Sequence, residues 1–383
     1  MHHRIQWLIP ILALLTAATA TATPTGFVRV GVTLPHACSN VFTVDDNGVL
    51  YYGHATSPFK TRDDGRAASD ELWKHDPAAG TSTIFYNAAN HVGSYQIKSV
   101  SAIAIDTGSS PWTYYIADQD PAGDPWSTGA IWAGHDDNDD GDIDDAGETG
   151  LVTDVSAFVY IEGLILDEAD GVLYATEAAG LSGSTMVHRL EDIDHSDFFE
   201  ALEITDYFMA PGDVYAGKLV FDISTTTVIY AVESGGTVHR LVDLNADDDC
   251  LDSGEDQVVV DTLAGGYGIA MDPEGDLFVT ASNYLTGQHY LYEIDLDAKA
   301  VTCIFDDLAP IAGWTGPVII DTGAVFEPYQ SGAVLYAAYS DLLWSDPSEI
   351  LSYRGAAPET PTLNMAGLAL LLGAVSLLIL LRR

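Results

Sequence analysis

The feature that most constrains the fold is a unit repeated six times along the chain. Each copy begins with an apolar strand ending in an aspartate, at Asp45, Asp106, Asp167, Asp222, Asp272 and Asp321, so the copies are 49 to 61 residues apart. A turn and a second β-type strand follow each aspartate, as in VLYYGH (49–54) and VLYATE (172–177). A third strand follows in every copy and a fourth in five of them. Four short strands per unit at this period are typical of the blades of a β-propeller.

The two ends of the repeat region complement each other. The sixth copy lacks a fourth strand, whereas Gly26–Thr33 is a spare apolar strand before the first copy. We therefore expect an all-β, six-bladed β-propeller over residues 23–355, in which the N-terminal strand completes the last blade. Such closure removes an exposed sheet edge. A pair of two-sheet β-sandwiches is the alternative, but it does not account for the six-fold repeat.

Both ends of the chain have the pattern of targeting segments. Residues 1–22 combine His2, His3 and Arg4 with the apolar run 7–15 and then small residues, which predicts a secretory signal peptide. A buried first helix is the alternative. Residues 356–364 form a linker, and the apolar run Met365–Leu381 precedes a terminal Arg pair, which predicts a transmembrane helix over 365–383 with the body of the protein outside.

The motif Pro361-Thr362-Leu363 precedes this predicted helix. The tail resembles the PEP-CTERM class of bacterial sorting signals in its Pro-Thr-Leu variant. The resemblance implies that an exosortase-like membrane enzyme processes the tail and that the protein is exported to the cell envelope, the cell surface or beyond. A plain C-terminal membrane anchor is the alternative reading.

The charge of the chain excludes two classes of partner. With 57 acidic and 14 basic residues, the formal net charge is −43. Such a surface repels nucleic acid and anionic lipid headgroups. It also fits a saline habitat, in which a hydrated acidic surface keeps a protein soluble. The three cysteines, Cys38, Cys250 and Cys303, are too few for a disulfide framework, and a pairing of Cys250 with Cys303 stays open.

Two acidic loops after third strands have the residue types of a cation site. Residues 136–148 read DDNDDGDIDDAGE and residues 243–255 read DLNADDDCLDSGE. Alternating oxygen ligands with no His pair nearby favour Ca²⁺ over Zn²⁺, and the first loop resembles a calcium loop of the EF-hand type. The predicted ligands are Asp136, Asn138, Asp140, Asp142, Asp145 and Glu148, and likewise Asp243, Asn245, Asp247, Asp249, Asp252 and Glu255. A solvated acidic loop is the alternative, and Asp192-Ile-Asp194 is a degenerate copy expected to have lost the site.

A second candidate site lies on the opposite face, where the first strands begin and the second strands end. We expect a ligand funnel there, lined by Asn40, His54, Asp118, Glu162, Glu177, Lys218, Glu233, Tyr267, Asn283, Trp314 and Asp341. Glu177 and Glu233 occupy the same register in neighbouring repeats, so with Glu162 and Asn283 they are candidates to hold a divalent cation that polarises a carbonyl. A solvated rim around the pore is the alternative.

At the level of the fold, the repeat resembles both NHL-repeat propellers and gluconolactonase-like propellers. The first resemblance implies binding, and the second implies a central Glu–Asn–Asp metal site. The leading hypothesis is a calcium-stabilised module at the cell surface or in the extracellular matrix that binds a protein or a glycan. The alternatives are a metal-dependent lactonase or hydrolase using Glu162, Glu177, Glu233 and Asn283, and a purely structural matrix protein.

Overall fold

The computed structural model describes most of the repeat region. The described residues are 27–33, 42–45, 47–54, 71–76, 78–91, 95–98, 100–119, 129–159, 161–178, 185–210, 216–222, 224–272, 275–283, 288–306, 319–326, 334–340 and 349–354. The predicted signal peptide, linker, sorting motif and membrane helix lie outside them. Among the described residues, no helix has the length and hydropathy required to cross a bilayer.

The described strands pair into six four-stranded antiparallel sheets, and the side chains of five of these are described. Blade 1 consists of β2 (Phe42–Val44), β3 (Leu50–His54), β4 (Glu71–Asp76) and β5 (Thr81–Asn87), followed by the short helix η3 (Ala88–Asn90). Blade 2 consists of β6 (Val100–Asp106), β7 (Thr113–Asp118), β8 (Ala130–His135) and β9 (Thr149–Leu151). Blade 3 consists of β10 (Ile161–Asp167), β11 (Val172–Ala178), β12 (Thr185–Leu190) and β13 (Ile204–Met209).

The remaining blades follow the same plan. Blade 4 consists of β14 (Ala216–Asp222), β15 (Thr225–Glu233), β16 (Val238–Val242) and β17 (Asp256–Val260). Blade 5 consists of β18 (Ile269–Met271), β19 (Leu277–Asn283), β20 (Gln288–Asp295) and β21 (Ala300–Asp306). In the sixth sheet, which is described through its backbone, β22 (Ile319–Phe326), β23 (Val334–Ser340) and β24 (Glu349–Arg354) are joined by β1 (Phe27–Thr33). There β1 runs antiparallel to β24, with Val28 opposite Ser352.

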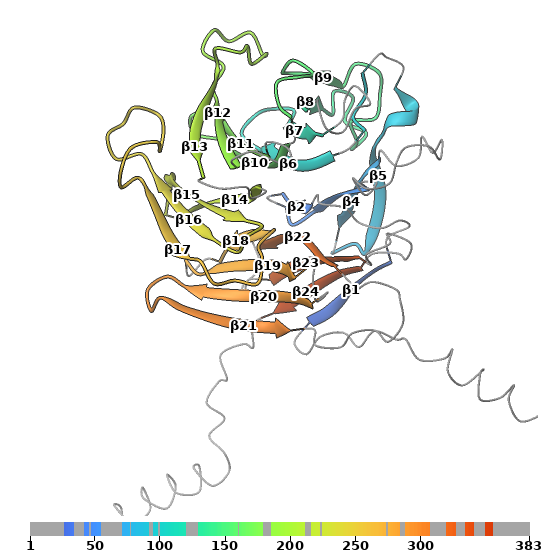
Figure 1. Cartoon of the computed structure of the whole chain (residues 1–383). Coiled ribbons are helices and arrows are strands. Elements are labelled where there is room, and N and C mark those ends of the chain that lie inside the picture. Colours follow the sequence, from blue (N-terminus) through green and yellow to red (C-terminus); the bar gives the residue numbers. More distant parts are fainter. Residues whose placement is uncertain are drawn as a thin grey trace, which may run out of the picture.

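The first strands of the sheets gather around a common centre, and the later strands lie progressively further out (Figure 1). Each first strand lies next to the first strand of the following sheet, from β2 through β6, β10, β14 and β18 to β22, which again adjoins β2. The prediction of a β-propeller is therefore confirmed.

The aspartate that ends each first strand has a structural role. Asp45 accepts hydrogen bonds through Oδ1 from the backbone N–H groups of Asn47 (2.8 Å) and Val49 (2.9 Å). Equivalent carboxylate bonds to the following turn are made by Asp106, Asp167, Asp222 and Asp272. A side chain that satisfies the turn's N–H groups fixes the reversal between the first two strands. The recurrence of this aspartate thus follows from turn chemistry.

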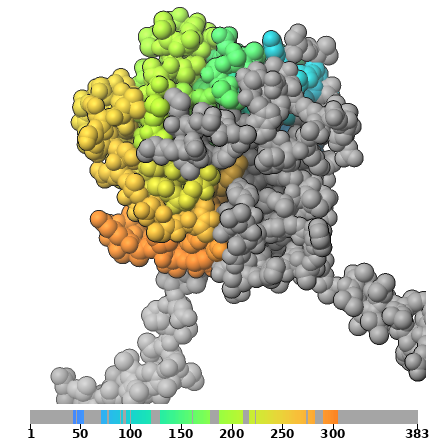
Figure 2. Space-filling model, viewed as in Figure 1, coloured from blue at the N-terminus to red at the C-terminus, as the bar shows by residue number. Residues whose placement is uncertain are grey.

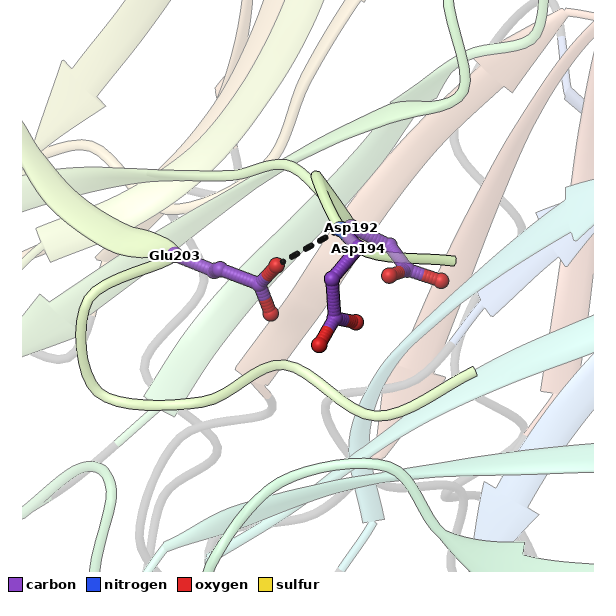
Figure 3. A group of neighbouring side chains, drawn as sticks. All are labelled: Asp192, Asp194 and Glu203. Atoms are coloured by element: carbon purple, nitrogen blue, oxygen red, sulfur yellow. Dashed lines mark hydrogen bonds between the residues drawn. The ribbon is translucent and has the colours of Figure 1, made fainter. Parts of the chain in front are cut away.

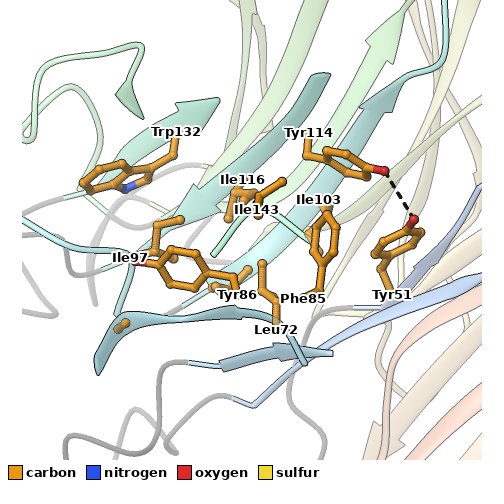
Figure 4. Close-up of a cluster of buried hydrophobic side chains, with 12 residues drawn as sticks. Tyr51, Leu72, Phe85, Tyr86, Ile97, Ile103, Tyr114, Ile116, Trp132 and Ile143 are labelled. Carbon is orange, nitrogen blue, oxygen red and sulfur yellow. Dashed lines mark hydrogen bonds between the residues drawn. The ribbon is translucent and has the colours of Figure 1, made fainter. Parts of the chain in front are cut away.

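The core lies between the faces of adjacent blades. Between blades 1 and 2, Tyr51, Leu72 and Phe85 pack against Tyr114 and Ile116, and all five side chains are buried (Figure 4). The ring of Phe85 stands edge-on to Tyr51 and to Tyr114, with centroid distances of 5.0 and 4.7 Å. Edge-to-face pairs add to the free energy gained by burial. Blades therefore adhere face to face through side chains from two copies of the repeat.

Close backbone packing near the centre gives a first prediction. A Cβ atom on Gly217 would lie 2.6 Å from the carbonyl oxygen of Val232 and 2.7 Å from that of Tyr267. Gly217→Ala should therefore lower the free energy of unfolding by about 1–3 kcal/mol, because the backbone must shift to admit the methyl group. Urea denaturation measures the loss. Gly150→Ala is the matched control, since a Cβ there would meet no atom within 4 Å; equal losses in the two variants would contradict the packing argument.

Candidate functional site

Three acidic loops connect the third and fourth strands of consecutive blades. They are the blade 2 loop (136–148), the blade 3 loop (191–203) and the blade 4 loop (243–255). The blade 3 and blade 4 loops project from the rim of the molecule (Figure 2). The three loops share one pattern of hydrogen bonds.

Each loop is wound around its first aspartate. In the blade 2 loop, Asp136 accepts from the backbone N–H of Asp140 (3.1 Å) and of Gly141 (2.8 Å). The equivalent bonds run to Asp243 from Asp247 (3.4 Å) and Asp248 (2.9 Å), and to Asp192 from Ser196 and Asp197 (3.0 Å each). The residue that donates the second of these bonds has a positive φ in all three loops, at Gly141 (94°), Asp197 (60°) and Asp248 (69°). Aspartate tolerates this left-handed conformation better than most side chains, so the loss of glycine leaves the turn intact.

A buried glutamate closes each loop. Glu148 accepts from the N–H of Asp137 through Oε1 and from the N–H of Asp145 through Oε2, both at 3.0 Å. Glu255 does the same with Leu244 (2.9 Å) and Asp252 (3.1 Å), and Glu203 with Ile193 (2.8 Å) and Glu200 (3.0 Å). These backbone bonds, which favour the ionised carboxylate, hold the pKa of Glu203 below its usual range.

The blade 3 loop keeps the arrangement of the other two loops, although the sequence predicts that it has lost the cation site. It is one residue shorter between its first Asp and its closing Glu, so Glu203 is not found by aligning the sequence to the other two loops. Asp192, Asp194 and Glu203 nevertheless point toward one another (Figure 3). Oxygen atoms of these three residues all lie within 4.8 Å of one another, and so do those of Asp243, Asp247 and Glu255. Two oxygens on opposite sides of a Ca²⁺ ion stand about 4.8 Å apart.

The remaining predicted ligands take part in the same loops. The amide nitrogen of Asn138 donates to Asp140 (3.2 Å) and Asp145 (2.6 Å), and that of Asn245 donates to Asp247 (2.9 Å) and Asp252 (2.8 Å). The side chains of Asp142 and Asp249 instead accept from N–H groups two residues on. Partial burial raises the pKa of Asp142, and the like charges of Asp140 and Asp144 raise it further.

Each loop is also attached to the blade before it. The N–H of Ile143 donates to the carbonyl of Phe85 in blade 1 (3.0 Å), that of Phe199 to Val152 at the end of blade 2 (2.7 Å), and that of Cys250 to Tyr207 in blade 3 (2.7 Å). Ile143, Phe199 and Cys250 are all buried. We call these three backbone bonds the interblade staples.

Burial raises the pKa of the Cys250 thiol to about 12, so this thiol is neutral. Neither Cys250 nor Cys303 forms a disulfide bond, so the pairing that the sequence left open is not made.

The carboxylates at the ends of the second strands bond within their own blades. Glu177 accepts from His188 Nε2 at 2.7 Å and from the backbone N–H of Val159. Oε1 of Glu233 lies 3.3 Å from Nε2 of His239. The segment Val-His-Arg-Leu occurs in both β12 and β16, and its histidine thus supplies a partner to the glutamate of the same blade. Asp118, at the same register in blade 2, accepts from the N–H of Lys98 (3.1 Å).

Side chains from several blades meet across the centre. Lys218 of β14 donates from Nζ to the backbone carbonyls of Glu162 (2.5 Å) and Ser101, in blades 3 and 2. The hydroxyl of Tyr267, just before β18, donates to Oε2 of Glu162 (3.2 Å). We call Lys218, Glu162, Tyr267 and Ser101 the axial network. Its cation is the ammonium group of Lys218, whose reach across the centre no sequence pattern indicated.

The predicted central metal residues do not come together among the described side chains. Glu162 belongs to the axial network, while Glu177 and Glu233 are engaged with histidines in separate blades. Asn283 ends β19 opposite Gln288, and its side chain is not described. Asn40, Trp314, Asp341 and the side chain of His54 also lie outside the described part. In that part, groups of acidic side chains with metal-ligand spacing occur in the blade 3 and blade 4 loops, and the blade 2 loop is not among them.

Comparison with known proteins defines the class of protein as a β-propeller. No protein-family model and no curated protein matches the chain. The fold is similar to that of a gluconolactonase from Xanthomonas campestris, with 12% identity, a TM-score of 0.53 and coverage of 88% of this chain and 96% of that one. It is also similar to a PQQ-bound aldose sugar dehydrogenase from Streptomyces coelicolor, with 14% identity, a TM-score of 0.52 and coverage of 86% and 96%. At these identities the likeness shows the fold alone.

The buried His239 gives a prediction about pH. Its Nδ1 lies 2.7 Å from Asp256 and its Nε2 faces Glu233, so only the imidazolium donates to both. Burial alone would lower the pKa of His239, but the two carboxylates outweigh it and raise the pKa. The resulting stabilisation should be complete below about pH 6.5, the unfolded-state pKa, and be lost as the pH rises through the folded-state pKa.

His239→Gln should therefore destabilise the protein more at about pH 6 than at about pH 8.5. Urea denaturation of both proteins at the two pH values measures the difference. The control is His195→Asn, because His195 is exposed and has a positive φ that asparagine tolerates. A loss for His239→Gln that is independent of pH would show that the histidine is neutral in the folded state.

Proposed function

We propose that this chain is an exported, six-bladed β-propeller closed by its N-terminal strand, and that its acidic loops bind Ca²⁺ to stabilise a binding module at the cell surface or in the extracellular matrix. The observation that carries the calcium proposal is the hydrogen-bond pattern that the three loops share. It holds the first aspartate and the closing glutamate of each loop against that loop's backbone, and in the blade 3 and blade 4 loops it brings oxygen atoms of two aspartates and this glutamate within 4.8 Å of one another.

Charge supports the same proposal. The blade 2 loop places eight acidic residues within thirteen positions, and like charges at such separations repel unless a cation neutralises them. The neutral thiol of Cys250 is not a ligand for a soft metal, which leaves the hard oxygen donors that Ca²⁺ prefers. Because each loop is stapled to the preceding blade, an ion that orders the loop also stabilises the contact between two blades.

Export and anchoring are part of the proposal and rest on the sequence. The segments 1–22, 356–364 and 365–383 supply the signal peptide, the sorting motif and the membrane helix, and an exosortase-like enzyme is the partner that they imply. The strongly acidic surface favours a protein or glycan ligand over a nucleic acid. Ring closure is supported by the pairing of β1 with β24.

The calcium proposal predicts a gain in thermal stability. Millimolar Ca²⁺ should raise the melting temperature of the chain, and a chelator should reverse the effect, because an ion that binds only the folded state stabilises it. Glu148→Gln, Glu203→Gln and Glu255→Gln should each reduce the gain, since each removes one buried ligand charge. Asp154→Asn, an exposed acid outside the loops, should leave the gain intact. An unchanged melting temperature at millimolar Ca²⁺ would refute calcium binding.

A second candidate function is favoured by the fold comparisons. Two enzymes with a similar fold, the gluconolactonase and the sugar dehydrogenase, favour a metal-dependent lactonase or hydrolase over a binding module. Its candidate residues remain Glu162, Glu177, Glu233 and Asn283. The geometry of the described residues offers it less support, because the ammonium of Lys218, rather than a cluster of carboxylates, bridges the first strands at the centre.

An assay of lactone hydrolysis distinguishes the enzyme from the binding module. The enzyme reading predicts hydrolysis of five- or six-membered lactones in the presence of a divalent ion, with activity abolished in Glu177→Gln and retained in Asp261→Asn, an exposed acid far along the chain. Product release followed by pH indicator measures the rate. Absence of turnover across a panel of lactones and divalent ions would leave the binding module as the function.

A further inference from the structure

The axial network spans the interior of the ring at the end where the first strands begin. Lys218 belongs to the fourth blade, yet its Nζ reaches the carbonyl of Ser101 in the second. Tyr267 leads into the fifth blade, yet its hydroxyl reaches Glu162 in the third. Each bond passes over an intervening first strand, so both side chains must cross the space that the ring encloses. Lys218 also donates its backbone N–H to the carbonyl of Tyr267 (2.9 Å), which ties the two crossings together.

A cavity of about 340 Å³ lies next to this network on the same strands. Ile103, Leu164 and Val220 line it, and each stands two residues beyond Ser101, Glu162 and Lys218, respectively. Each of these strands has a β-bulge at its network residue, and beyond the bulge the same strand continues along the wall of the cavity. The cavity is contributed by the first strands of blades 1 to 4, and its volume lies within the range of small-molecule pockets.

The other end of the cavity is acidic. Asp45, Glu168 and Asp222 line it where the first strands end, which is the side of the blades that carries the acidic loops. Partial burial would raise the pKa of Asp222, but hydrogen bonds from Ser224 and Tyr230 and the charge of Arg240 outweigh it and lower the pKa. No Lys, Arg or His is among the described residues that line the cavity. An apolar body and a carboxylate rim therefore meet in one pocket.

We propose that this axial cavity binds a small organic cation, an ammonium group carried on an alkyl or aromatic body. The apolar body lies against Ile103, Leu164 and Val220, and the ammonium group lies at the rim among Asp45, Glu168 and Asp222. The net charge of the chain attracts a cation and repels an anion, which complements the rim. This inference rests on the proposed function as a binding module, and it adds the class of ligand. The ligand enters from the face of the propeller opposite to the funnel that the sequence predicts.

Three probes of one shape and different charge test the proposal. We expect 2-phenylethylammonium to bind the full-length chain about tenfold more tightly than 2-phenylethanol, and 3-phenylpropionate to bind more weakly still, because the rim carboxylates discriminate by charge. Isothermal titration calorimetry in saturating Ca²⁺ measures the three affinities while the acidic loops are neutralised. Equal affinities for the three probes, or no binding of the ammonium compound, would overturn the proposal.

Variants locate the site. Glu168→Gln should weaken binding of the ammonium probe, whereas Asp154→Asn, an exposed acid outside the cavity, should not. Leu164→Phe should also block the probe by filling the cavity; if it fails to fold, the comparison of Glu168→Gln with Asp154→Asn decides. An unchanged affinity in Glu168→Gln would refute the site. A calcium-dependent rise in melting temperature without binding of the ammonium probe would refute this inference alone and leave the calcium proposal standing.

Discussion

The structure depends on the burial of apolar sheet faces between neighbouring blades. A four-stranded sheet with two apolar faces is unstable by itself, and an apolar cluster is buried between each pair of consecutive sheets from blade 1 to blade 5. The cluster of Tyr51, Phe85 and Tyr114 shows the result, since its residues come from two blades and its rings interlock edge to face. This requirement places the first strands around a common centre, and it holds the acidic loops at the rim.

The repeat predicted the strands well because it recorded constraints that every blade shares. The aspartate after each first strand satisfies a turn, and the apolar strand before it fills an interface, so both signals recur with the blades. The spare strand Gly26–Thr33 similarly indicated its partner, since β1 pairs with β24. Local interactions that recur in every blade leave a repeated residue pattern, and a single sequence is enough to predict them.

Contacts between side chains of different blades leave no such pattern, and the sequence did not predict them. Glu203 was missed because it follows the first aspartate of its loop by one residue fewer than Glu148 and Glu255 do, although it makes the same backbone bonds. Lys218 occurs once and acts across blades, so no period marks it. Glu177 and Glu233 share a register, but each bonds to a histidine on its own sheet, and a shared register does not bring side chains of different blades together. The cavity, formed where four strands converge, likewise has no counterpart within any one unit.

The interblade staples all run in the same direction around the ring. Each runs from a loop to the blade that precedes it, linking blade 2 to 1, blade 3 to 2 and blade 4 to 3. Among the described residues, no loop of this kind ties blade 5 to blade 4; the backbone bond from Lys218 to Tyr267, just before β18, joins these two blades instead. If the loops bind Ca²⁺ as proposed, loss of the ion would loosen the contacts among blades 1 to 4, which the loops join, more than the contacts elsewhere in the ring.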